Sequence, residues 1–230
     1  MSTGAIRAVA FDLDGTLVDS RLDLAEAVNR TRGGLALEPL AVASVLGMVG
    51  EGARNLVRRA LGDAPEPALF ERAFAAFLNH YDEVCLDRTR PFPGVEALLE
   101  RLAARLPLAV VTNKPERFSR RIVDHLGWKE RFRVLVGGDS LPTRKPDPGG
   151  LRHAADRLGT SIEGLLFVGD SRIDAQTAVA AGAPLVLAVW GFAALAERAE
   201  LADYRWIDDP SELDAIVAAG ARDCFGLSTG

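Results

Sequence analysis

The chain has 230 residues, 48% of them hydrophobic, and a formal net charge of -5 at pH 7. This size allows a sizeable core, and the acidic balance argues against an extended basic face for nucleic acid. No apolar run reaches the roughly 18 residues that a membrane span needs, and the start of the chain lacks the basic and apolar regions of a signal peptide. Only two cysteines are present, Cys85 and Cys224, so neither a disulfide framework nor a zinc site is indicated.

Short apolar runs that end in polar residues alternate with amphipathic segments along most of the chain. The runs predict strands that are buried on both faces, at residues 8–11, 108–111, 134–136, 165–168, 185–189 and 204–207. Apolar residues spaced i, i+3, i+4, i+7 predict helices over 95–102 and 151–158. This alternation predicts an α/β fold, a doubly wound parallel sheet with a Rossmann-like core.

Residues 20–88 break the alternation, because they contain helical patterns and no convincing strand. One such pattern is formed by Phe70, Phe74, Phe77 and Tyr81. We therefore predict an inserted α-helical cap over 20–88, with the catalytic core formed by 1–19 and 89–230. The prolines within 90–94 predict a turn or hinge where the insertion ends. Ligands of open α/β sheets bind at the carboxyl ends of the strands, so the cap would lie over the site.

Polar residues follow four of the predicted strands at the point where each ends. They are Asp12 and Asp14, then Thr112 and Asn113, then Lys145 in a later loop, and then Asp170 and Asp174. A parallel sheet would bring all of them to one edge. Carboxylates gathered there repel one another and call for a hard cation, and their oxygens suit Mg²⁺. Lys145, Thr112 and backbone N–H groups could hold a phosphate beside that cation.

The ordered set D-x-D-G-T, T-N-K, K-P and G-D-S-x-x-D resembles the haloacid dehalogenase-like hydrolase superfamily. The resemblance covers essentially the whole chain, cap included. Within the superfamily, the segments 49–53, 89–95, 111–115 and 137–140 look most like the phosphoglycolate phosphatase family. One departure is Ile173, where that family often has a polar residue.

The resemblance implies a role for each matching residue. Asp12 would be the nucleophile that forms an aspartyl phosphate, and Asp14 would be the general acid and base. Mg²⁺ would be held by the Asp12 side chain, the Asp14 backbone carbonyl and Asp170. Thr112, the Asn113 backbone and Lys145 would hold the transferring oxygens. Asp174 would orient Lys145 or a metal-bound water, although it could also be a helix acid favoured by the macrodipole.

Two further features bear on the substrate. The turn Gly50, Glu51 and Gly52 precedes a helical pattern, so its amides could bind a substrate carboxylate, or it could be a plain turn between helices. Lys114 matches a motif position, and we expect it to face solvent or the cap hinge. These features and the resemblance together predict a cytoplasmic phosphatase that hydrolyses 2-phosphoglycolate, a small phosphate ester.

Other functions stay open at this point. A phosphatase or mutase for sugar phosphates or nucleotides would carry the same core motifs with a different cap. A phosphoacceptor without enzymatic activity, like a response-regulator receiver, would share the sheet but be about half as long and lack Asp14. We expect no nucleic-acid or membrane partner, and either a monomer or a homodimer.

Overall fold

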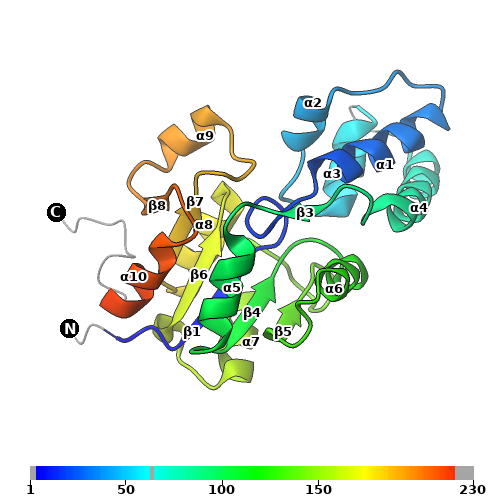
Figure 1. Ribbon diagram of the computed structural model, residues 1–230. Coiled ribbons are helices and arrows are strands. Elements are labelled where there is room, and N and C mark those ends of the chain that lie inside the picture. The colour runs from blue at the N-terminus through cyan, green and yellow to red at the C-terminus, as the bar shows by residue number, and fades with distance from the viewer. Residues whose placement is uncertain (1–3, 63–64, 221–230) are drawn as a thin grey trace.

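The computed structural model describes residues 4–62 and 65–220; Met1 and Cys224 are among those outside this part. Its centre is a six-stranded parallel sheet with the strand order β5-β4-β1-β6-β7-β8 (Figure 1). The strands are β1 (Ala8–Phe11), β4 (Leu108–Val111), β5 (Phe132–Val136), β6 (Leu165–Gly169), β7 (Leu185–Ala188) and β8 (Trp206–Ile207). The chain runs outward from β1 to one edge and then to the other, so β1 lies where the winding direction changes.

Helices cover both faces of this sheet. Cores on the two faces draw on α5 (Val95–Ala103), α6 (Glu116–His125) and α10 (Glu212–Ala219) on one side, and on α7 (Gly149–Leu158) and α8 (Arg172–Ala181) on the other. Side chains of β1 alternate between them, with Val9 and Phe11 in the first core and Ala8 and Ala10 in the second. The predicted class, a doubly wound α/β sheet with a helical insertion, is confirmed.

The two edge strands differ from the sequence-based expectation. β5 starts earlier than predicted, at Phe132, and its residues are mostly half-exposed because only one neighbour covers it. β8 is only Trp206–Ile207, because the backbone N–H of Tyr204 turns back to the carbonyl of Leu201. Two short elements complete the core: η1 (Ile162–Gly164) and α9 (Leu195–Glu200). Within residues 4–62 and 65–220, no helix combines the length and apolar character that crossing a bilayer requires.

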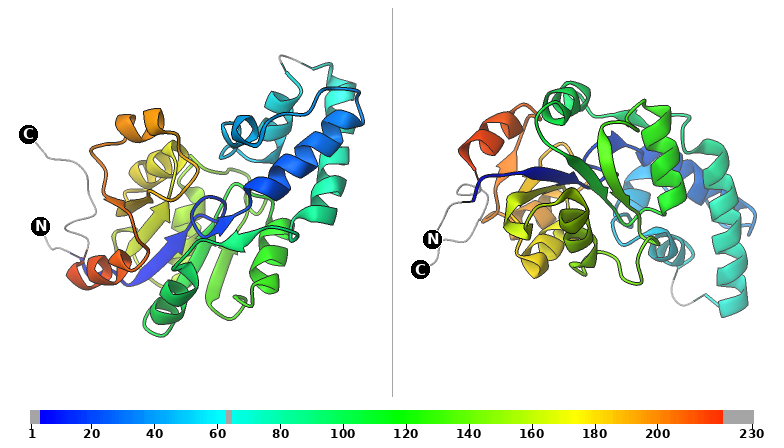
Figure 2. Two further views of the ribbon diagram at one scale, coloured as in Figure 1. Left: turned by 45° about the horizontal axis from the view of Figure 1, so that its top comes forward. Right: turned by 90° about the horizontal axis from the view of Figure 1, so that it is seen from below.

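The insertion consists of α1 (Arg21–Gly33), α2 (Val42–Leu46), α3 (Ala53–Ala60) and α4 (Pro67–Val84). These helices lie beyond the end of the sheet where β1 leads into the insertion, as both views of Figure 2 show. They enclose a separate hydrophobic core that includes Leu56, Phe70 and Phe77, and also Phe118 from α6 of the sheet domain. The free thiol of Cys85 is buried in the same core.

Two strands that the sequence did not predict join the insertion to the core. β2 (Val18–Asp19) and β3 (Arg90–Pro91) pair antiparallel, so the outgoing and returning segments run side by side. Beside them, the buried carboxylate of Asp23 accepts hydrogen bonds from the Arg88 N–H, the Thr89 N–H and the Thr89 hydroxyl, the last two at 2.8 Å. Asp23 therefore fastens the start of α1 to the chain that leaves the helices.

Replacing Asp23 with alanine removes the acceptor of these three hydrogen bonds and leaves their donors without it. We expect the free energy of unfolding to fall by about 2–4 kcal/mol. Urea titration followed by circular dichroism measures this loss. Asp203→Ala, at an exposed aspartate, is the control and should change the free energy by less than about 0.5 kcal/mol. Equal stability of the two variants would contradict the fastening role of Asp23.

Candidate active site

The polar residues predicted from strand ends do meet at one edge of the sheet. β1 lies between β4 and β6, so Asp12 is flanked by Thr112 on one side and Asp170 on the other. All three side chains are buried. Backbone hydrogen bonds fix two of them, because the N–H of Asp12 donates to the Val168 carbonyl at 2.8 Å and that of Thr112 donates to Val136 at 2.9 Å. The parallel ladder thus continues into the site and aligns these residues.

Lys145 reaches this edge from the loop after β5 and joins two carboxylates. Its buried ammonium Nζ lies 2.9 Å from Asp12 Oδ1 and 2.6 Å from Asp174 Oδ1. The other oxygen of Asp174 accepts from the N–H groups of Asp170 and Ser171 and from the Ser171 hydroxyl. Ser171 and Asp174 form a capping box at the start of α8. Asp174 therefore holds Lys145 and the Asp170 backbone in place.

Burial and mutual repulsion shift the pKa values of these groups. Burial raises the pKa of Asp12 to about 6, against the opposing effect of Lys145. Burial, together with the charges of Asp174 and Asp12, raises the pKa of Asp170 well above its ordinary value. Burial lowers the pKa of Lys145, but Asp12 and Asp174 outweigh it and hold this pKa above its ordinary value. The Lys145 ammonium is thus kept charged, whereas Asp12 and Asp170 have too little positive charge nearby to balance their negative charges.

These carboxylates fit a divalent cation. One oxygen from each of Asp12, Asp170 and Asp174 lies within 4.8 Å of the others. Oδ1 of Asp12 is buried without a hydrogen bond of good geometry, so it has a free lone pair to offer. Asp174 pairs with the Lys145 ammonium through one oxygen and accepts three hydrogen bonds on the other, whereas Asp170 accepts one hydrogen bond on each oxygen. Asp170 therefore has more capacity left for a cation than Asp174, and with Asp12 it is the better ligand. Gly15 makes room for them, because a Cβ there would lie 2.4 Å from an Asp170 oxygen.

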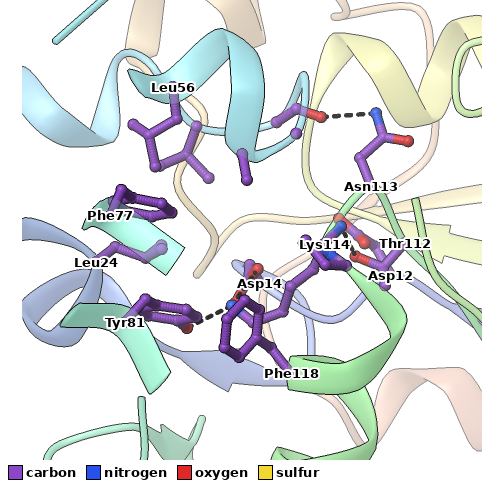
Figure 3. Close-up of a pocket in the computed structure, with 15 residues that line it drawn as sticks. Asp12, Asp14, Leu24, Leu56, Phe77, Tyr81, Thr112, Asn113, Lys114 and Phe118 are labelled. Carbon is purple, nitrogen blue, oxygen red and sulfur yellow. Dashed lines mark hydrogen bonds and ion pairs between the residues drawn. The ribbon is translucent and has the colours of Figure 1, made fainter. Parts of the chain in front are cut away.

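The side chain of Asp14 points away from this cluster toward the helical insertion. It accepts a hydrogen bond from the Ser20 hydroxyl at 2.6 Å, and both of its oxygens lie 2.9 Å from Lys114 Nζ. Lys114 also donates to the Tyr81 hydroxyl at 2.5 Å (Figure 3). Of the two alternatives for Lys114, the one that faces solvent is wrong, since only 6% of the residue is exposed, and its contacts with Asp14 and Tyr81 place it where the core meets the insertion. The partner carboxylate and the Tyr81 hydroxyl compensate its charge in this apolar setting.

Asn113 connects the site to the insertion through its side chain. Its amide NH₂ donates to the carbonyls of Gly50 and Lys145, each at 2.9 Å. Of the predicted turn, Gly50 and Gly52 line a cavity with Asp12 and Asp14, whereas Glu51 bonds to Asn55 and Arg59. Gly52 takes a φ of +88° and lies so close to the Asn113 carbonyl that a Cβ would come within 3.1 Å of it.

Two hollows open beside Asp12 and Asp14. The inner one is a cavity of about 50 Å³ between the strand ends and α1, α3, α4 and α6, and it has room for a group of only a few atoms. The outer one is about 510 Å³ and is lined by residues that include Asp170, Arg172 and Phe192. A phosphate ester reaching Asp12 through the outer hollow could place its small organic part in the inner cavity.

Sequence reasoning missed three side chains of this site. Ser20, Tyr81 and Lys114 surround Asp14, and only Lys114 carried a signal, as the third residue of T-N-K. Its burial depends on α4 and α6 packing over it, which periodicity does not reveal.

Comparisons with known proteins identify the family that this chain is similar to. A model of the haloacid dehalogenase-like hydrolase family matches residues 6–182. A phosphoglycolate phosphatase of Chromobacterium violaceum is 41% identical over 198 residues, covering 84% of this chain and 89% of that protein. One of Rhodospirillum rubrum is 45% identical over 195 residues, covering 81% and 80%. The crystal structure of a predicted phosphoglycolate phosphatase from Haemophilus somnus superposes with a TM-score of 0.84 at 30% identity, covering 93% of this chain and 99% of that one.

The family match spans well over half of the chain, and the relatives cover most of it at about 40% identity. Because members of this family are hydrolases, the match also rules out the alternative of a receiver-like phosphoacceptor without enzymatic activity. The chain therefore belongs to the haloacid dehalogenase-like hydrolases and is an enzyme, a phosphoric monoester hydrolase.

Proposed function

We propose that this enzyme is a Mg²⁺-dependent phosphatase that hydrolyses 2-phosphoglycolate to glycolate and phosphate. The observation that carries the proposal is the placement of Asp12, a buried carboxylate between Lys145 and Asp170 at the mouth of a small cavity. That arrangement suits attack on a phosphate whose organic part is small. The names of the relatives, phosphoglycolate phosphatases, support the same substrate.

In the proposed mechanism, Asp12 attacks phosphorus and the ester oxygen leaves, which gives an aspartyl phosphate on Asp12. Lys145, the Thr112 hydroxyl and the Asn113 N–H hold the oxygens of the transferring group. Asp14 donates a proton to the departing oxygen and then takes one from the water that hydrolyses the aspartyl phosphate. Mg²⁺, held by Asp12, Asp170 and the Asp14 carbonyl, would supply charge neutralisation between the carboxylates and the phosphate.

The domain division follows from this mechanism. We assign residues 1–19 and 89–230 to the catalytic core and 20–88 to the cap. The core supplies the reacting side chains, and α1, α3 and α4 of the insertion supply Leu24, Leu56, Phe77 and Tyr81 to the inner cavity. A cap in this position would exclude water and limit the size of the leaving group.

Asp12→Asn should lower kcat by more than about 10³-fold, because an amide cannot attack phosphorus. Steady-state rates with 2-phosphoglycolate and with p-nitrophenyl phosphate measure the effect, and circular dichroism checks the fold. Asp203→Asn is the control and should retain the parent rate. Turnover of Asp12→Asn within tenfold of the parent would refute the covalent role of this residue.

Removal of divalent metal with EDTA should abolish activity, and added Mg²⁺ should restore it, since the buried carboxylates need a cation to admit a phosphate. Asp170→Asn should raise the Mg²⁺ concentration for half-maximal activity at least about tenfold, because one anionic ligand is lost. Ca²⁺ should inhibit, because its longer bonds and higher coordination number let both Asp12 oxygens bind. Full activity after exhaustive chelation would contradict the metal requirement.

The substrate is tested by kcat/KM across a panel of phosphate esters with Mg²⁺. The panel contains 2-phosphoglycolate, 3-phosphoglycerate, glucose and fructose phosphates, nucleoside monophosphates, pyrophosphate and phosphoethanolamine. We expect 2-phosphoglycolate to lead by at least about tenfold, which is ~1.4 kcal/mol of differential transition-state binding. A leading sugar phosphate or nucleotide would replace the substrate assignment and leave the phosphatase chemistry. Isomerisation of glucose 1-phosphate would indicate a mutase.

A further inference from the structure

The inner cavity beside Asp14 combines an apolar wall with a single cation. Its wall is formed by hydrophobic side chains of the insertion and of α6: Leu24, Leu56, Phe77, Tyr81 and Phe118. Figure 3 shows Leu24, Leu56 and Phe77 across the cavity from Lys114. Among the residues that line this cavity, the charged ones are Asp12, Asp14 and Lys114. Any anionic group that enters the cavity has only one cation to meet.

No arginine is among the residues that line the inner cavity. Arg54 pairs with Glu71 and stacks over Phe70 and Phe74, and Arg59 pairs with Glu51. Both of these arginine side chains are about two-fifths exposed, and neither lines the inner cavity. Arg59 and Arg172 line the outer hollow, but a carboxylate inside the inner cavity meets a cation from the core, directly after Thr112 and Asn113 in the chain.

Lys114 is buried and held by contacts to both Asp14 oxygens and to the Tyr81 hydroxyl. Its side chain is 3% exposed and is ion-paired to Asp14. The Tyr81 ring below it is stacked on Phe77 and meets Phe118 edge-on, with ring centroids 5.8 Å and 4.9 Å apart. A buried ion pair in apolar surroundings is weak support for stability, because desolvation offsets the attraction. A role in binding explains why the pair stands at the edge of a cavity.

We propose that Lys114 binds a carboxylate of the substrate's leaving group and so selects short phosphorylated hydroxy acids. This inference rests on the proposed function. Asp14 acts on the ester oxygen, and in 2-phosphoglycolate the carboxylate carbon is two bonds from that oxygen. A group bound so close to Asp14 lies within reach of Lys114, whose Nζ is 2.9 Å from both Asp14 oxygens. An anion there would meet Asp14 unshielded if Lys114 were neutral or absent.

The test compares two substrates on the full-length protein with Mg²⁺: 2-phosphoglycolate and its neutral amide, which has the same skeleton without the carboxylate charge. Lys114→Met removes the ammonium and keeps the length of the apolar part of the side chain. In Lys114→Met, the kcat/KM for 2-phosphoglycolate divided by the kcat/KM for the amide should fall about 10- to 100-fold relative to the parent protein. This is the effect expected for one hydrogen bond between ions. Most of the loss should appear as a raised KM for 2-phosphoglycolate. Lys129→Met, at an exposed lysine outside the cavity, should leave the ratio unchanged.

Two results for Lys114→Met would overturn the inference. An unchanged ratio with both kcat/KM values at the parent level would show that Lys114 does not bind the carboxylate. An equal loss with both substrates would show that Lys114 only positions Asp14. Failure of the proposed function shows elsewhere, in the parent protein, as a lack of preference for 2-phosphoglycolate over the rest of the panel.

A second measurement needs no variant, in case Lys114→Met does not fold. Glycolate and glycolamide are compared as inhibitors of p-nitrophenyl phosphate hydrolysis by the parent protein. Glycolate should inhibit at a concentration at least about tenfold lower, because only its charged group pairs with Lys114. Equal inhibition by the two compounds would overturn the inference.

Discussion

One electrostatic constraint governs the site: at the carboxyl end of the sheet, buried negative charges outnumber buried positive charges. Three buried carboxylates, Asp12, Asp170 and Asp174, share one buried ammonium, that of Lys145. Because positive charge is lacking, the pKa values of Asp12 and Asp170 are raised and both carboxyl groups tend to hold protons. A phosphate would add negative charge to the same space, so phosphate binding and cation binding have to go together. A bound cation would therefore relieve the repulsion among these carboxylates.

Close backbone approach makes this crowding sterically possible. Gly15 and Gly191 both face Asp170, and a Cβ on Gly191 would come within 2.2 Å of the Asp170 Cβ. The N–H of Phe192 donates to the carboxylate of Asp170 at 2.6 Å, and the Thr16 hydroxyl donates at 3.2 Å. The segments after β1 and β7 thus fix the direction of a side chain that follows β6. Small residues and backbone donors thus orient the Asp170 carboxylate so that its remaining lone pairs point toward Asp12 and Asp174.

The meeting of the polar side chains at one edge of the sheet could be predicted from the sequence, because it follows from the direction of the strands. Asp12, Thr112 and Asp170 each follow an apolar run, and parallel pairing alone brings such positions together. Features that arise from packing between distant helices could not be predicted in this way. Lys114 is buried because Tyr81 of α4 and Asp14 of the first loop meet it, and nothing local to T-N-K encodes those contacts. The strands β2 and β3 were missed because two residues are too few to show a periodicity.

The same packing explains how the insertion and the core act as one unit at the site. Phe118 belongs to α6 of the core, yet it completes the hydrophobic core of the insertion, and Asn113 bonds to the carbonyl of Gly50. Separation of the two parts would expose apolar surface and break this hydrogen bond, so closure over the strand ends is favoured. The reacting groups come from the core, and most of the cavity wall comes from the insertion. Lys114 connects the two parts, because it follows Thr112 and Asn113 in the core and donates a hydrogen bond to Tyr81 of the insertion. Under the proposed function, this arrangement would place selection for the size and charge of the leaving group next to the residues that act on the phosphate.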